Sequence, residues 1–156
     1  MADGVKIRRP RKRELIDKFR RLAPAAAEAA AAANKEGAED MARLARKFAP
    51  VKSGALRDSI KVTPPGGVLP AHSQGTPPVV GAGSYAVSAG NSGVRYAHLI
   101  EFGTLPHTVG GQFAGAQHPG TPPRPFFFPA YRVARQQHKK RVGKAVRSAY
   151  KKVAKS

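Results

Sequence analysis

The sequence predicts an α+β protein in which a long helix at each end encloses a middle of short strands and loops. Helix-forming residues, with apolar positions three and four apart, dominate both ends of the chain. The middle is rich in Gly and Pro and contains short alternating segments typical of strands. At 156 residues the chain has the length of one domain. We predict a basic disordered arm over 1–9 and a single domain over 10–156.

The first long helix is predicted over about 11–49. An apolar stripe with spacings of three and four runs through this segment, and the stretch 25–33 is almost entirely alanine, the strongest helix former. Pro24 predicts either a kink or a fresh helix start, and Gly37 is a weak point in the helix. Because alanine has little surface to bury, we expect this helix to lie close against a neighbouring helix.

The middle of the chain is predicted to alternate between strands and loops. Residues 59–63 and 79–90 each carry a strand-like pattern. The segments 64–78 and 104–123 are rich in Pro and Gly, which predicts surface loops. Over 94–102 the pattern fits a strand that tightens into a helical turn, and periodicity does not decide between the two over so few residues.

The second long helix is predicted over about 129–154, after a sheet core at about 51–128. Apolar residues step along one face of this helix by three and four, and Lys and Arg fill the other faces. Five of the seven phenylalanines lie between positions 102 and 128. We therefore expect the aromatic part of the core near the start of the second helix.

Positive charge is concentrated at both ends of the chain. The 28 Lys and Arg against nine Asp and Glu give a net charge of +19, and no acid follows Glu101. Nine of the cations lie in 6–21 and eleven in 124–155. Such a field attracts polyanions, so nucleic acid or an acidic protein surface is an expected partner. The candidate contact residues are Arg8, Arg9, Arg11, Lys12, Arg13, Lys139, Lys140 and Arg141.

Catalytic and metal-binding patterns are weak in this sequence. His98, Glu101, His107 and His118 match no established zinc spacing, and the chain has no Cys. Ser84, His98 and Glu101 can be combined into a triad on paper, but no serine lies in a nucleophile-elbow motif. No apolar run has the 18 residues of a membrane span. We predict a protein that is not an enzyme and has no metal, no cofactor and no membrane partner.

Glu101 is the only acid after Asp58, and it lies within an apolar run. A buried carboxylate is costly unless it is paired. Arg124, on a proline-stiffened turn, is the first expected partner, with Arg57 or Arg95 as alternatives. Within one subunit such a pair would fix the turn to the core, and between subunits it would set the register of an assembly. We expect Glu101→Ala to impair assembly more than folding; the alternative is an ordinary surface glutamate.

Three motifs occur in order along the chain, at 49–60 (APVKSGALRDSI), 96–104 (YAHLIEFGT) and 123–130 (PRPFFFPA). Together they resemble the tailed-phage head–tail joining family, whose members are also called neck, tail-completion or minor tail proteins. The resemblance covers roughly residues 48–131. It implies a small curved antiparallel sheet between a long N-terminal helix and a long C-terminal helix, which here is basic. It also implies a structural virion protein of the phage neck, assembled in the bacterial host cytoplasm.

The resemblance implies that copies form a ring around the DNA channel, between head and tail. The implied partners are other copies of the chain, portal and adaptor or stopper proteins, tail-tube or tail-terminator proteins, and genomic DNA. The residues expected in the core or between subunits are Leu56, Arg57, Tyr96, Glu101, Phe102, Arg124, Phe126 and Phe127. The competing class is a free-standing basic nucleic-acid-binding or DNA-packaging protein, which the basic helices favour although no DNA-reading motif is present.

Overall fold

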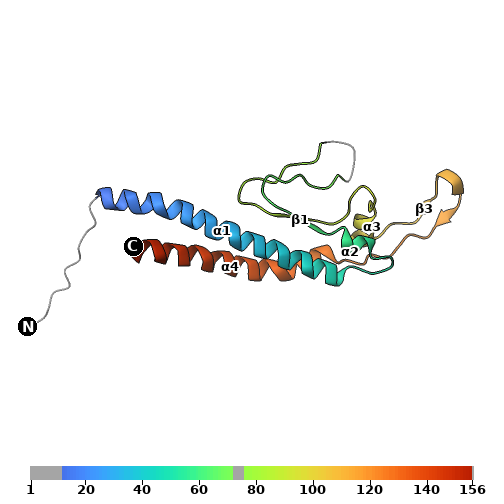
Figure 1. The fold of residues 1–156 in the computed structure, drawn as a ribbon. Helices are drawn as coiled ribbons and strands as arrows, with labels where there is room; N and C mark the ends of the chain where they lie inside the picture. Colours follow the sequence, from blue (N-terminus) through green and yellow to red (C-terminus); the bar gives the residue numbers. More distant parts are fainter. Residues whose placement is uncertain (1–11, 72–75, 156) are drawn as a thin grey trace, which may run out of the picture.

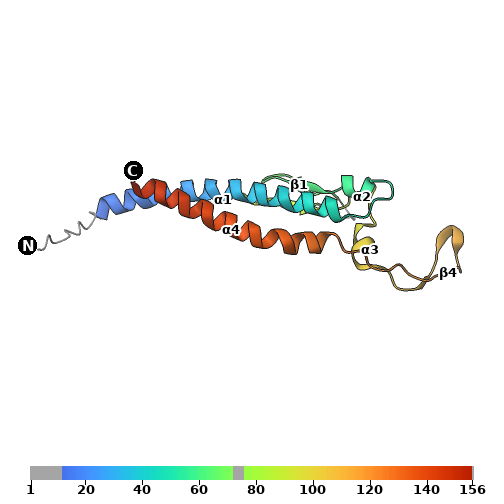
Figure 2. The same cartoon turned by 90° about the horizontal axis from the view of Figure 1, so that it is seen from below.

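The computed structural model describes residues 12–71 and 76–155, and two long helices dominate it (Figure 1). These helices, α1 (Lys12–Phe48) and α4 (Phe127–Lys155), run antiparallel and side by side (Figures 1 and 2). Between them along the chain lie α2 (Ala55–Asp58), β1 (Lys61–Thr63), β2 (Ala86–Ser88), α3 (Ala97–Phe102), β3 (His107–Thr108), the 3-10 helix η1 (Gly111–Phe113) and β4 (Gln117–His118). The predicted α+β class with a long helix at each end is confirmed. The arm predicted over 1–9 lies outside the described residues.

The helix α1 is continuous over 37 residues, which corresponds to about 55 Å. Pro24 lies inside it, so the fresh helix start considered from the sequence does not occur. Ala42 and Ala45 are fully buried in the core, together with Ala130 of α4. The neighbouring helix expected from the alanine content is therefore α4.

Gly37 is a point of close approach between the two long helices. A methyl group added there would overlap the imidazole of His138 on α4. The glycine expected to weaken α1 is thus required by the packing of α4 against it. At the same place, Arg141, one turn after His138 on α4, forms ion pairs with Glu36, at 3.1 Å, and with Asp40 of α1.

The strands form two separate two-stranded antiparallel sheets, one of β1 with β2 and one of β3 with β4. In the first, Lys61 pairs with Ser88, Val62 with Val87 and Thr63 with Ala86; in the second, His107 pairs with His118 and Thr108 with Gln117. Only 86–88 of the predicted 79–90 strand pair in a ladder, since a turn closed from Ser84 N–H to the oxygen of Gly81 precedes them. The segment 94–102 forms the helix α3 at its end.

The first of the three motifs joins the end of α1 to the first sheet. The hydroxyl of Ser59 donates a hydrogen bond to the carbonyl oxygen of Leu56, at 2.7 Å, and accepts one from Gly90 N–H, at 2.9 Å. The guanidinium of Arg46 donates to the carbonyl oxygen of Ile60, at 2.6 Å. These bonds satisfy buried polar groups and hold α2 against both α1 and the segment after β2.

The core lies where the end of α1, α2, α3 and the start of α4 meet. Phe126 and Ile60 are its largest fully buried side chains. Of the five phenylalanines expected in this core, Phe127 is half-buried, whereas Phe102, Phe113 and Phe128 are exposed. The prediction of an aromatic core is therefore wrong for these three. Small alanines fill the space between the helices instead.

Residues 103–123 form a hairpin arm that projects beyond the end of the helical pair (Figures 1 and 2). The base of the arm is closed by the paired residues Thr104 and Thr121, whose N–H groups each donate to the other's carbonyl oxygen at 3.0 Å. Gly103 precedes this pair with φ 73° and ψ −176°, a conformation that is essentially restricted to glycine. A Cβ at this position would lie 2.5 Å from the carbonyl oxygen of Thr121.

We expect Gly103→Ala to open the base of the hairpin arm. The backbone strain alone costs on the order of 1–3 kcal/mol, and the clash with Thr121 adds to it. The change is measured by chemical unfolding together with limited proteolysis of 103–123. Gly110→Ala is the matched control on the same arm, because Gly110 has φ −100° and a Cβ added there would meet no atom within 4 Å. Equal behaviour of the two variants would contradict the role assigned to Gly103.

Candidate assembly interface

Glu101 connects α3 to the start of α4. Glu101 is 6% exposed, and its two carboxylate oxygens accept three backbone hydrogen bonds. The donors are the N–H groups of Phe126, Phe127 and Phe128, at 2.8, 2.9 and 3.0 Å. N–H groups at the start of a helix have no partner within the helix, and the helix dipole favours a negative charge there. Glu101 therefore caps α4 from a separate element.

With the cap in place, every N–H group at the start of α4 has a hydrogen-bond acceptor. Pro129 follows the three capped residues and has no N–H group. The next residue, Ala130, donates to the carbonyl oxygen of Phe126. The acid of the second motif and the phenylalanines and proline of the third thus form one hydrogen-bonded unit, which sets where α4 begins.

The expected ion pair between Glu101 and an arginine is absent from the described residues. No ion pair there includes Glu101 or Arg124, and Arg57 pairs with its neighbour Asp58 at 3.6 Å. Arg124 is attached to α3 through its backbone N–H, which donates to the carbonyl oxygen of Ile100 at 2.8 Å. A side-chain partner was expected for Glu101, whereas main-chain N–H groups satisfy its carboxylate.

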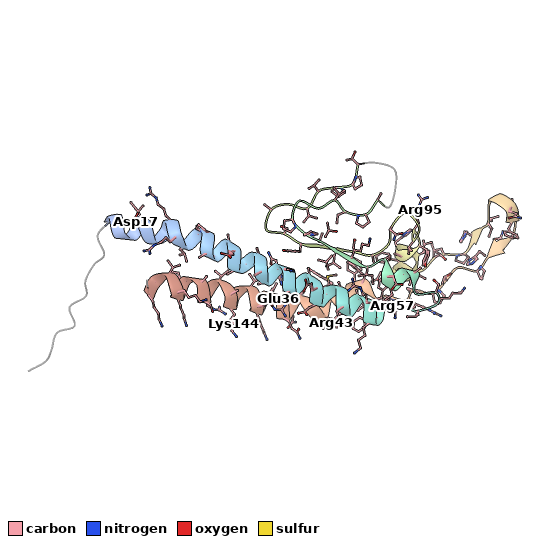
Figure 3. The ribbon with its side chains drawn as sticks, in the orientation of Figure 1. Asp17, Glu36, Arg43, Arg57, Arg95 and Lys144 are labelled. Carbon is pink, nitrogen blue, oxygen red and sulfur yellow. The ribbon has the colours of Figure 1, made fainter. Side chains whose placement is uncertain are left out.

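The residues predicted for the core or the subunit interface separate into two groups. Leu56, Glu101 and Phe126 are buried, and Phe127 is half-buried; Arg57, Tyr96, Phe102 and Arg124 are exposed. The exposed group lies around α2, α3 and the segment before α4, at the end of the molecule where Figure 3 labels Arg57 and Arg95. These exposed residues stay candidates for contact between subunits.

Exposed apolar residues on the hairpin arm were missed by the sequence argument. Leu105 and Phe113 are 84% and 70% exposed, and Phe102 at the base of the arm is 66% exposed. The ring of Phe102 lies beside that of Phe128, with 5.8 Å between centroids. The sequence does contain a signal for this exposed apolar region, namely its lack of charge. Arg95 and Glu101 are the only Lys, Arg, Asp or Glu between 62 and 123.

An apolar groove of about 680 Å³ runs beside this aromatic pair, between α1, β2 and α4. Met41, Tyr85, Phe127, Phe128 and Tyr131 line it, and Arg135 and Lys139 also contribute to its walls. Phe128 belongs both to the groove and to the aromatic pair, so the two features adjoin near the start of α4.

The residues predicted to contact a polyanion differ in their surroundings. Arg8, Arg9 and Arg11 lie outside the described residues, and so do the side chains of Lys12 and Arg13. Lys139 and Lys140 are exposed on α4. Arg141 instead faces α1 in the ion pairs described above, so it belongs to the packing of the helices. The antiparallel pairing also places the start of α1 beside the end of α4 (Figure 1), which brings the described part of the first basic segment near the basic end of α4.

The histidines and acids considered for chemistry are dispersed over different elements. His107 and His118 stack across the hairpin arm, with ring centroids 5.1 Å apart. In the described part of the chain, no three His, Asp or Glu residues come together as a possible metal site. Both oxygens of Glu101 are bonded to α4, and no hydrogen bond joins this residue to His98 or Ser84 there. None of the described helices has an apolar stretch long enough to cross a bilayer.

The described part of the chain is elongated, with a helical pair, a projecting arm and exposed apolar side chains. Residues 13–103 match the model of the family described as "Bacteriophage HK97-gp10, putative tail-component". This match covers more than half of the chain, so the protein belongs to that family. It is a phage structural protein associated with the virion, and the membership favours a structural role over an enzymatic one. Comparison with curated proteins and with solved structures gave no match.

Proposed function

We propose that the protein is a subunit of the phage neck, where copies form a ring around the DNA channel and join the head to the tail. Its neighbours in this proposal are the portal and adaptor or stopper proteins on one side and the tail-tube or tail-terminator proteins on the other. Family membership supports a tail component. The observation that carries the finer proposal is the nearly uncharged region from 62 to 123, whose hairpin arm exposes apolar side chains.

A net charge of +19 on each copy opposes self-association. The region from 62 to 123 avoids this repulsion, because its only charged residues are Arg95 and the buried Glu101. This region includes β2, α3 and the hairpin arm, and the arm extends away from the basic helices (Figure 1). Copies that meet through it keep their cationic helices apart.

The hairpin arm also supplies apolar surface for such a contact. Leu105 and Phe113 are among the most exposed apolar side chains described, and full burial of a Leu or Phe contributes about 1.5–3 kcal/mol. An arm that packs on a different surface of the next copy makes a head-to-tail contact, and head-to-tail contacts close into a ring when the rotation between copies permits. The apolar groove between α1, β2 and α4 is a receiving surface of suitable character.

The neck function is tested with phage that lacks this chain. We expect such phage to accumulate separate heads and tails, and expression of the chain in the host to restore joined particles, counted by electron microscopy. Normal joining without the chain would overturn the proposal. So would the appearance of the tagged chain only along the tail and never at the neck.

A paired substitution tests the role of the hairpin arm. We expect Leu105→Gln with Phe113→Gln to abolish both ring formation and the joining of particles, because two apolar contacts per interface are lost. Rings are measured by native mass spectrometry, in solution and after extraction from particles. Val133→Gln with Tyr150→Gln is the matched control, since both residues are exposed on α4 outside the arm. Normal rings from the arm variant would contradict this contact.

A second candidate is a free-standing DNA-binding protein, which one observation favours. The helix α4 carries ten Lys and Arg and no acid. Under this alternative, the purified protein would coat duplex DNA tightly at physiological salt, and phage without it would still join heads to tails.

A further inference from the structure

Five cations form a stripe along the second half of α4. Lys140, Lys144, Arg147, Lys151 and Lys155 follow one another at intervals of four, three, four and four residues, which places them on one face of a helix. All five are exposed, and none takes part in an ion pair within the described residues. We call these five residues the α4 stripe.

The α4 stripe faces away from the rest of the subunit. The opposite side of α4 packs on α1 through the buried Ala134 and through the ion pairs of Arg141, and Ala149 is also buried. Figure 3 shows Lys144 on the side of α4 that points away from α1. From Lys140 to Lys155 the stripe extends about 22 Å along the helix axis. It is therefore a straight cationic edge that the fold leaves uncovered.

The structure adds further cations at the same end of the molecule. Arg20 and Arg21 are exposed on the first turns of α1, and the antiparallel pairing places this end of α1 beside the C-terminal end of α4 (Figures 1 and 2). Of these two, Arg20 lies 3.9 Å from Asp17. Cations more than a hundred residues apart in the sequence thus reinforce one another.

We propose that the α4 stripe binds the phosphate backbone of duplex DNA without regard to base sequence. This inference rests on the proposed function, in which DNA passes through the ring. Duplex DNA carries one negative charge for about each 1.7 Å of its axis, so a cationic edge of this length can reach several phosphates at once. Lysine and arginine contacts to phosphates position a protein on DNA but carry no sequence information.

The composition of the α4 stripe favours DNA over an acidic protein as the partner. Four of its five members are Lys, which is depleted in protein–protein interfaces. Tyr150 is the one large apolar or aromatic side chain that is exposed within the span of the stripe, whereas protein–protein interfaces need an apolar centre. The exposed apolar residues of the hairpin arm and the groove lie toward the other end of the subunit. The two ends of the molecule are therefore suited to different partners.

The test is the salt dependence of binding to a fluorescently labelled 20-base-pair duplex, followed by anisotropy. For the variant Lys140→Gln, Lys144→Gln, Lys151→Gln we expect the slope of log affinity against log salt to fall by about 2–3, since each lost phosphate contact removes about 0.9. We expect affinity at low salt to fall at least tenfold. Glutamine keeps a good helix propensity, so α4 stays helical.

The matched control is Lys47→Gln, Lys52→Gln, Lys61→Gln. It removes the same charge from exposed sites near the far end of the helical pair. We expect its slope to stay close to that of the wild type. Equal losses of affinity in the two variants would show that only net charge matters, and this would overturn the proposal. A stripe variant that binds like the wild type would overturn it as well. Equal affinity of the wild type for polyglutamate and for DNA would assign the stripe to an acidic protein instead.

The particle assay separates this inference from the proposed function. Joined particles with a stripe variant that binds DNA like the wild type would overturn the inference and leave the neck function standing. Stripe-dependent DNA binding, with normal joining in phage that lacks the chain, would overturn the neck function and support the stripe as the site of a DNA-binding protein.

Discussion

Replacing Glu101 with alanine is expected to destabilise the folded subunit severely. The substitution leaves the N–H groups of Phe126, Phe127 and Phe128 without their acceptor at the edge of the core. Hydrogen bonds to a charged group contribute about 1.5–3 kcal/mol each, and each buried N–H group left unsatisfied costs about 1–3 kcal/mol, so losing all three bonds costs on the order of 3 kcal/mol or more. We expect a loss of that size, which is a large part of a typical domain stability of about 5–15 kcal/mol. The measurement is urea unfolding followed by circular dichroism.

Two further variants give this experiment its controls. Glu101→Gln keeps the shape and one acceptor oxygen, so we expect a loss of about half that of alanine, in line with the lost charge. Glu39→Ala removes an exposed acid of α1 that has no ion pair in the described residues, and we expect a change within about 0.5 kcal/mol. If Glu101→Ala unfolds like the wild type but fails to assemble, the intersubunit role predicted from the sequence is favoured over the cap.

Adding one methyl group at Gly37 is expected to destabilise the subunit, although alanine is the better helix former. The new Cβ overlaps the imidazole of His138, and overpacking of this kind costs about 1–3 kcal/mol. In a His138→Ala background the obstruction is gone. There the same substitution is expected to stabilise by about 0.5–1 kcal/mol, because it removes the helix-propensity cost of glycine. The sign of the effect therefore depends on His138.

A double-mutant cycle of Gly37→Ala and His138→Ala measures this coupling by urea unfolding. Gly143→Ala on α4 is the matched control, since the added Cβ would meet only the side chain of Arg147, at 3.6 Å or more. We expect that variant to be stabilised in both backgrounds. A stabilising effect of Gly37→Ala in the wild-type background would show that α1 and α4 do not pack closely at this point.

The two long helices were predictable because each carries its own periodic signal over about 30 residues or more. Their observed bounds, Lys12–Phe48 and Phe127–Lys155, lie within two residues of those expected from the sequence. The strands were less predictable, since β1 and β2 have three residues each and β3 and β4 have two. Over such lengths, turns formed by glycine and proline outweigh any alternating pattern.

The cap on α4 was not predictable by the usual rules for helix ends. Those rules search within three residues of the helix start, whereas Glu101 lies 25 residues before the first group that it accepts from. The sequence showed that this carboxylate needs a partner, and it did not show that the partner is a backbone. Gly37 and Arg141 illustrate the same limit, because their roles exist only once α1 and α4 lie side by side.

The pairing of α1 with α4 has a consequence for synthesis of the chain. The helix α1 leaves the ribosome first, and its partner follows only after residues 49–126. During this interval the face of α1 that later packs on α4 is exposed to solvent. Alanine suits this situation, because it favours helix formation before any packing and exposes little apolar area for aggregation. The residue that permits close helix packing in the finished subunit thus also protects the unfinished chain.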